Sequence, residues 1–111
     1  MAKFTVTNTG SASVQDITAW EDKSTNFTAV AFKGYRIDTS SAEIEMTLPS
    51  SPEISDRVSF MDYKRNFETN NFIIKQGGSK IMGASEDLTI NVNNFNSSLI
   101  YTGADEGWVI L

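Results

Sequence analysis

Apolar residues recur at every second position in several segments of this chain, and this period of two constrains the fold more than any other feature. The clearest case is the segment 42–48, whose apolar residues are Ala42, Ile44, Met46 and Leu48. Successive side chains of a β-strand point to opposite faces of the sheet. The segment therefore predicts a strand with one face in the core and the other in water. No segment has the 3.6-residue period of an amphipathic helix.

Turn-forming residues separate about nine or ten short segments of this kind. The candidate strands cover residues 3–7, 14–20, 28–37, 42–48, 57–63, 72–75, 80–82, 88–92, 98–102 and 108–111. The segment 14–20 also fits a single helical turn. Short strands at regular spacing predict an all-β domain, either an antiparallel β-sandwich or a small barrel-like fold of about 9–10 short strands.

Two glycine positions carry more specific expectations. Gly34 interrupts the strand pattern of residues 28–37, which predicts a bulge or a tight bend there. The segment Gln76–Ser79 contains two consecutive glycines between the apolar runs 72–75 and 80–82. It predicts a tight hairpin turn with positive φ at a glycine.

The composition excludes several classes of function. The chain has 111 residues, a size that suits one domain. It has no Cys and no His, so it lacks thiolate chemistry and the most common general base. The net charge of −5 argues against binding a nucleic-acid backbone, which requires clustered Lys and Arg. No run of apolar residues approaches the roughly 20 that a membrane span needs.

Acidic side chains are the main remaining candidates for chemistry. Glu43 and Glu45 share one strand face about 7 Å apart, a separation close to that between the two carboxylates of a glycosidase. A solvated sheet face explains this pair better, since 111 residues of short strands leave little material for a cleft. The acidic pairs 86–87 and 105–106 could hold Ca²⁺, but neither has the spacing of a calcium loop. We therefore expect no enzyme activity, no catalytic residues, no cofactor and no metal.

The aromatic residues fall into two groups. One lies within apolar alternation and predicts core positions: Phe60, Phe72 and Trp108. The other is flanked by polar residues: Trp20, Tyr63, Phe67 and Phe95. Aromatic residues in polar surroundings pack in a core, anchor a partner subunit or stack on sugars.

A series of short motifs runs through residues 34–111. In order they are GYRIDTS (34–40), TLPSSP (47–52), DRV (56–58), MDY (61–63), NFETNNF (66–72), GSKI (78–81), DLTIN (87–91), LIY (99–101) and GW (107–108). Together they resemble a β-rich module of tail-fibre and other virion structural proteins of tailed phages, including myoviruses and cyanophages. The resemblance spans residues 34–111, and residues 1–33 lie outside it.

This resemblance implies a non-enzymatic virion structural protein: a head fibre, a decoration or cement protein, or a tail-fibre subunit. It further implies a homotrimer on a capsid or tail partner, located in the virion and assembled in the host bacterial cytoplasm. The alternative is a carbohydrate- or receptor-binding module at a fibre tip, with a host glycan as its ligand. The resemblance supplies no catalytic residues.

The N-terminal segment and the C-terminal run suggest where partners bind. Residues 1–33 are predicted to form an N-terminal arm or edge hairpin that docks the module or exchanges between subunits. The C-terminal run 108–111 is apolar on both faces, which predicts burial in the core or at a subunit contact. The predicted partner or subunit interface comprises Phe4, Val6, Trp20, Tyr63, Phe67, Trp108, Ile110 and Leu111.

Overall fold

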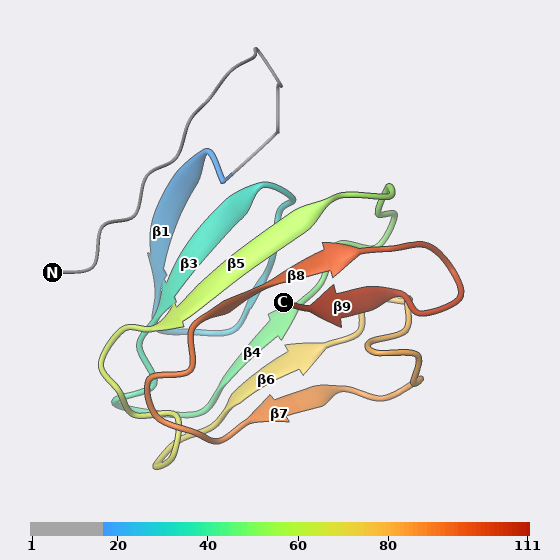
Figure 1. Ribbon diagram of the computed structural model, residues 1–111. Coiled ribbons are helices and arrows are strands. Elements are labelled where there is room, and N and C mark those ends of the chain that lie inside the picture. The colour runs from blue at the N-terminus through green and yellow to red at the C-terminus, as the bar shows by residue number, and fades with distance from the viewer. Residues whose placement is uncertain (1–16) are drawn as a thin grey trace, which may run out of the picture.

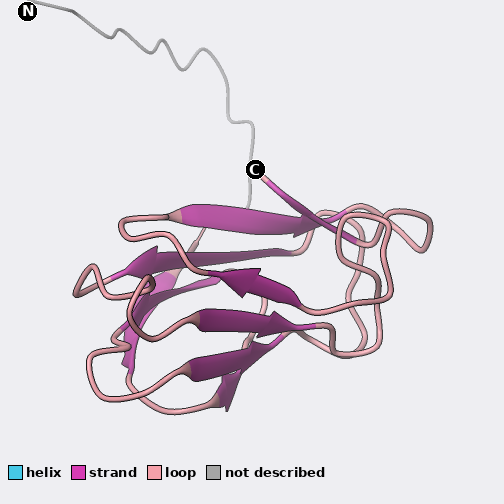
Figure 2. Cartoon of the chain, turned by 90° about the horizontal axis from the view of Figure 1, so that it is seen from below, coloured by secondary structure: helices cyan, strands magenta, loops and turns pink. Residues whose placement is uncertain are grey.

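The computed structural model describes residues 17–111, and within them every regular element is a β-strand (Figures 1 and 2). The larger sheet contains β1 (Ala19–Lys23), β3 (Lys33–Ile37), β5 (Arg57–Asp62), β8 (Ser97–Tyr101) and β9 (Trp108–Ile110), in that order. The smaller sheet has the order β2 (Phe27–Thr28), β4 (Ile44–Thr47), β6 (Phe72–Lys75) and β7 (Leu88–Ile90). The all-β prediction is confirmed.

The prediction of antiparallel sheets is wrong for half of the fold. From β1 to β6 the chain visits the two sheets in turn, so each sheet receives its next strand after a passage through the other. Strands added in this way run in the same direction, and β1–β3, β3–β5, β2–β4 and β4–β6 are parallel pairs. Only the last three strands pair antiparallel with their neighbours. Both sheets are therefore mixed.

The predicted strand 28–37 consists of two strands in different sheets. Phe32 lies between β2 and β3 with a φ of 66°, a conformation that interrupts an extended chain. Its amide donates to the Arg57 carbonyl at 2.6 Å, which fixes the crossing point against the start of β5. β1 and β2 likewise belong to different sheets. The predicted division of the chain into an N-terminal arm (residues 1–33) and a module (residues 34–111) stays a prediction.

Gly34 lies in a regular strand and not at a bulge, so the bulge prediction is wrong. It is the cross-strand partner of Trp20, and a Cβ at this position would lie 2.5 Å from the Trp20 indole. The glycine therefore provides room for the indole to lie over the backbone of β3. This is a close-approach role for glycine, and an aromatic residue covers the position.

The core is built by buried residues of the alternating segments in both sheets. Ile44, Met46 and Leu48 are buried as predicted, whereas Ala42 precedes β4 and is exposed. Aromatic rings connect the two sheets. The Phe60 ring of β5 lies 5.1 Å from the Phe72 ring of β6. Edge-to-face and tilted ring pairs of this kind add to the free energy gained from burial.

The predicted hairpin at residues 76–79 is also corrected. Gly78 has the expected positive φ, 100°. However, β6 does not turn directly into a strand at residues 80–82; its antiparallel partner is β7, which begins only at Leu88. The intervening segment 76–87 leaves the smaller sheet, and its residue Ile81 forms bridges to Ala84 and Trp108. This excursion contributes most of the residues that line a surface hollow.

Candidate functional site

The segment 80–84 is joined to the C-terminal segment by backbone hydrogen bonds. The Trp108 amide donates to the Lys80 carbonyl at 2.8 Å, and the Met82 amide donates to the Trp108 carbonyl at 2.8 Å. The Gly83 amide also donates to the Glu106 carbonyl at 2.8 Å. These bonds cover the outer edge of β9, and they hold two loops distant in sequence at a fixed separation.

Gly107 makes this close approach possible. Its φ is +71°, and an added Cβ would lie 2.0 Å from the Lys80 carbonyl oxygen. A side chain at this position would meet both backbone strain and a backbone clash. The glycine that precedes Trp108 in the terminal motif therefore has a structural reason: it lets two backbones meet.

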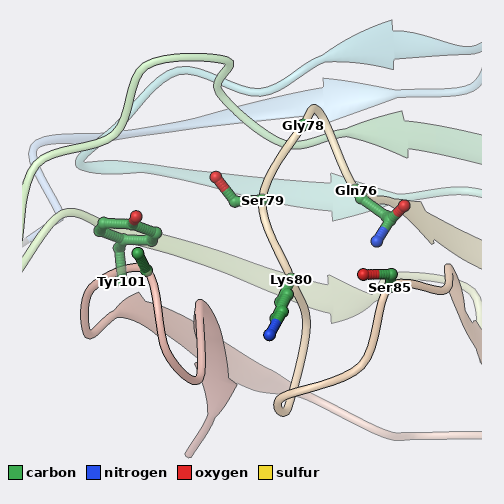
Figure 3. A pocket seen from close by; sticks show the side chains of 7 residues that line it. Gln76, Gly78, Ser79, Lys80, Ser85 and Tyr101 are labelled. Carbon is green, nitrogen blue, oxygen red and sulfur yellow. The ribbon is translucent and has the colours of Figure 1, made fainter.

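A polar hollow of about 350 Å³ opens between these loops (Figure 3). Its lining residues are Gln76, Gly78, Ser79, Lys80, Ser85, Tyr101 and Ala104. In the view of Figure 3, Gln76 and Ser85 lie on one side of the loop that carries Gly78 and Ser79, and Tyr101 lies on the other. The lining thus combines an amide, two hydroxyls, an ammonium group and a phenol ring.

Tyr101 forms a fixed wall of this pocket. Its ring lies 5.5 Å from the Trp108 ring at an interplanar angle of 60°. Its amide donates to the Asp56 carbonyl and its carbonyl accepts from the Ser55 amide, both at 2.9 Å. Because Trp108 is fully buried, the aromatic wall is supported directly by the core.

Asp87 joins the two ends of the segment 76–87. Its Oδ1 accepts from the Gln76 amide at 2.9 Å, and its Oδ2 lies 3.2 Å from the Lys75 ammonium nitrogen. The Gln76 amide and then Lys75 lower the pKa of the Asp87 carboxyl below its ordinary value, although partial burial opposes them. The hydrogen bond and charge of Asp87 raise the pKa of Lys75. Asp87 therefore acts as a loop clamp.

The charge pattern of the pocket is distinctive. Among the residues described by the structure, none that lines the pocket is acidic, and no carboxylate is within ion-pair distance of the Lys80 ammonium. By contrast, Lys33 and Lys75 each have a carboxylate partner. Lys80 is therefore the one charged residue in the lining, and it forms no ion pair with the described residues.

The residues predicted for an interface are dispersed. Phe67 and Trp108 lie in the core, where Phe67 stacks on Phe72 at 5.1 Å. Trp20 is 41% exposed and Leu111 is 65% exposed, while Ile110 is partly buried. The predicted burial of Leu111 is not met within the single chain. Phe4 and Val6 lie outside the described residues.

Tyr63 directly follows β5 and lies beside Arg36 of β3. It is 39% exposed, with the Arg36 guanidinium 5.8 Å and the Lys64 ammonium 4.6 Å from its ring centre. Both distances fall within the range of a cation–π contact. The structure thus does not bring Tyr63 and Trp108 together in one site.

Within the described residues, the acidic candidates belong to no cluster of metal-ligating side chains. Glu43 is exposed and lies directly before β4, and the Glu45 backbone amide donates to the Asn26 side-chain oxygen at 2.8 Å. In residues 17–111 there is no group of three or more acidic side chains placed to hold a metal ion. In the same part of the chain, no helix is long and apolar enough to cross a membrane.

Sequence reasoning missed the pocket. It treated Gln76–Ser79 as a hairpin turn, whereas three of these residues line a hollow that also needs Ser85 and Tyr101. The available signal was Lys80, a basic residue between a glycine turn and an apolar pair. That signal is too weak to identify a site without the contact between the two loops.

Comparison of the chain with protein-family models gives no match, and comparison with curated proteins gives none either. The fold and the site are therefore interpreted from the chain itself.

Proposed function

We propose that this chain is a non-enzymatic structural subunit of a tailed-phage virion. It serves as a head fibre, a decoration or cement protein, or a tail-fibre subunit. It assembles as a homotrimer on a capsid or tail partner, in the host bacterial cytoplasm. The motif series in residues 34–111 supports this role, as does the all-β fold.

The observation that best supports assembly is the open edge at β1. Within residues 17–111, β1 is the first strand of the larger sheet and has a strand partner only on its β3 side. At the opposite edge, β9 is covered by the segment 80–82. An uncovered edge presents backbone donors and acceptors that another chain can pair with. Trp20, which is 41% exposed, lies on this strand.

We also infer that the two sheets form a sandwich. The contact between Phe60 and Phe72 supports this arrangement, as does the position of the core residues in both sheets. β1 and β2 are the first strands of their sheets, and the Phe27 ring of β2 lies 4.7 Å from the Tyr35 ring of β3. The two edges therefore lie near each other, and one partner can cover both.

Light scattering on a sizing column tests the assembly. A homotrimer has three times the chain mass of 12.3 kDa, or 36.9 kDa. The variant Trp20→Lys places a charge at the β1 edge and is expected to shift the mass toward 12.3 kDa. Ile54→Lys is the matched control, because Ile54 is 71% exposed and lies in the turn before β5, outside any strand. A mass of 12.3 kDa for the unaltered chain at every concentration would contradict self-assembly.

A carbohydrate-binding role is the second candidate. The polar pocket beside Tyr101 is the observation that favours it, because sugar sites combine an aromatic surface with hydrogen-bonding side chains.

A further inference from the structure

We propose that the pocket between residues 76–85 and Tyr101 binds an acidic sugar, a pyranose unit that carries a carboxylate, as part of a glycan. This deepens the carbohydrate-binding candidate and does not depend on assembly through β1.

The size of the pocket sets the class of ligand. Its volume of about 350 Å³ lies at the lower end of the range for small-molecule sites. It is open to solvent on one side, so it suits one unit of a longer chain better than an enclosed small molecule. A monosaccharide unit with its glycosidic bonds directed outward satisfies both conditions.

The hydrogen-bonding groups favour a polyol. Gln76 supplies an amide that both donates and accepts, and the hydroxyls of Ser79 and Ser85 do the same. Sugar hydroxyls also donate and accept, so each can pair with such a group in either direction. A phosphate or sulfate would need donors alone, and a pocket for these anions would be richer in Arg and backbone amides.

Tyr101 and Lys80 provide the two remaining features. The Tyr101 ring, supported by Trp108, offers an apolar surface for the C–H groups of a pyranose. The Lys80 ammonium has no carboxylate partner among the described residues and can bind the carboxylate of the sugar. A charge-assisted hydrogen bond to this group separates acidic from neutral sugars.

The walls of the pocket are preorganised by contacts within the chain. The Lys80 backbone carbonyl accepts a hydrogen bond from the Trp108 backbone amide, and the Gln76 backbone amide donates to the Asp87 carboxylate. Both loops are thereby fixed by contacts that a ligand does not need to create. Preorganised walls reduce the entropy lost on binding.

The test is a titration of the full, isotope-labelled chain followed by amide NMR shifts. The probes are tri-galacturonate, the neutral trisaccharide of galactose and acetate. We expect saturable shifts centred on residues 76–85 and 101–104 with tri-galacturonate only. Lys80→Gln should weaken this binding about tenfold, the loss of one charge-assisted hydrogen bond. Lys64→Gln is the matched control, since Lys64 lies beside Tyr63.

Ser85→Val provides a second, independent variant, and we expect it to weaken binding while the NMR spectrum stays that of a folded chain. The absence of saturable shifts at the pocket would overturn the proposal. Equal affinity for the neutral trisaccharide, or for acetate, would overturn the assignment to an acidic sugar. Unchanged affinity in Lys80→Gln would do the same. The mass of the protein does not enter this measurement, so its failure is distinct from failure of the proposed assembly.

Discussion

Asp62 is a buried carboxylate whose hydrogen bonds all go to loop backbone. It is 4% exposed, and its oxygens accept from the amides of Asn66, Phe67 and Asn94 at 3.0, 3.2 and 3.0 Å. The Asp62 amide itself donates to the Asn96 side chain at 2.9 Å. One residue at the end of β5 therefore fixes two loops that are far apart in sequence.

Replacing this carboxylate tests its role. We expect Asp62→Ala to lower the free energy of unfolding by about 2–3 kcal/mol, because three backbone donors lose their acceptor in a largely buried region. Asp62→Asn retains one carbonyl acceptor, so its free energy of unfolding should lie between those of the unaltered chain and Asp62→Ala. Urea denaturation followed by circular dichroism measures both changes. Asp105→Ala, in an exposed turn, is the control. Equal stability of Asp62→Ala and this control would refute the assignment.

At the scale of elements, we expect the ionised form of Asp87 to stabilise the connection from β6 to β7. The pKa of this carboxyl is lowered from its ordinary value of 3.8, chiefly by the Gln76 amide. Its stabilising effect is therefore present above pH 3.8 and is lost as pH falls through the lower, folded pKa. The pKa of Lys75 is raised from 10.5 by Asp87, so its contribution is present below 10.5 and is lost at higher pH.

These directions predict a pH window for the clamp. The stability difference between the unaltered chain and Asp87→Asn should be largest at about pH 5–9 and should shrink on both sides. The effect is small, because both side chains are partly exposed to solvent. Urea midpoints at a series of pH values measure it, and the difference between the two proteins removes the contribution of other carboxyls. A difference that stays constant with pH would argue against an electrostatic role.

The same elements show what the sequence could predict. Periodicity identified the strands around residues 42–48, 57–63 and 72–75, and it placed Val58, Phe60 and Ile74 within them. It works here because one face of each strand is buried. Strand direction leaves no such mark. An alternating strand has the same pattern whether its neighbour is parallel or antiparallel, so the mixed sheets were not predicted.

The candidate site was predicted poorly for a related reason. Of the four aromatic residues flanked by polar residues, Trp20 and Tyr63 are exposed, whereas Phe67 is fully buried and Phe95 packs against the core. The pocket, however, depends on the contact of Gly107 with the Lys80 carbonyl, which joins segments 27 residues apart in sequence by a backbone approach. A glycine in a sequence indicates conformational freedom but not the partner that it admits.

At the scale of the whole molecule, the two ends of the larger sheet differ. β9 is covered by the chain's own segment 80–82, with Met82 sulfur accepting from the Ile110 amide at 3.3 Å. β1 has no comparable cover within residues 17–111. If the chain assembles through this sheet, as proposed, β1 is the edge that can accept a strand of another subunit.

Leu111 allows folding and assembly to be separated. It follows β9 and is 65% exposed, although its amide donates to the Ser98 carbonyl at 2.8 Å. Leu111→Ser keeps that backbone bond, so we expect the free energy of unfolding of the monomer to change by less than about 0.5 kcal/mol. If Leu111 lies at a subunit contact, the same variant should weaken self-association measured by light scattering across a concentration series.

Deleting residues 110–111 is different, because Ile110 pairs with Leu99 and packs on the core, and folding itself should be lost. A monomer destabilised by Leu111→Ser as much as by the deletion would place Leu111 in the folding core, and unchanged association would remove it from the interface.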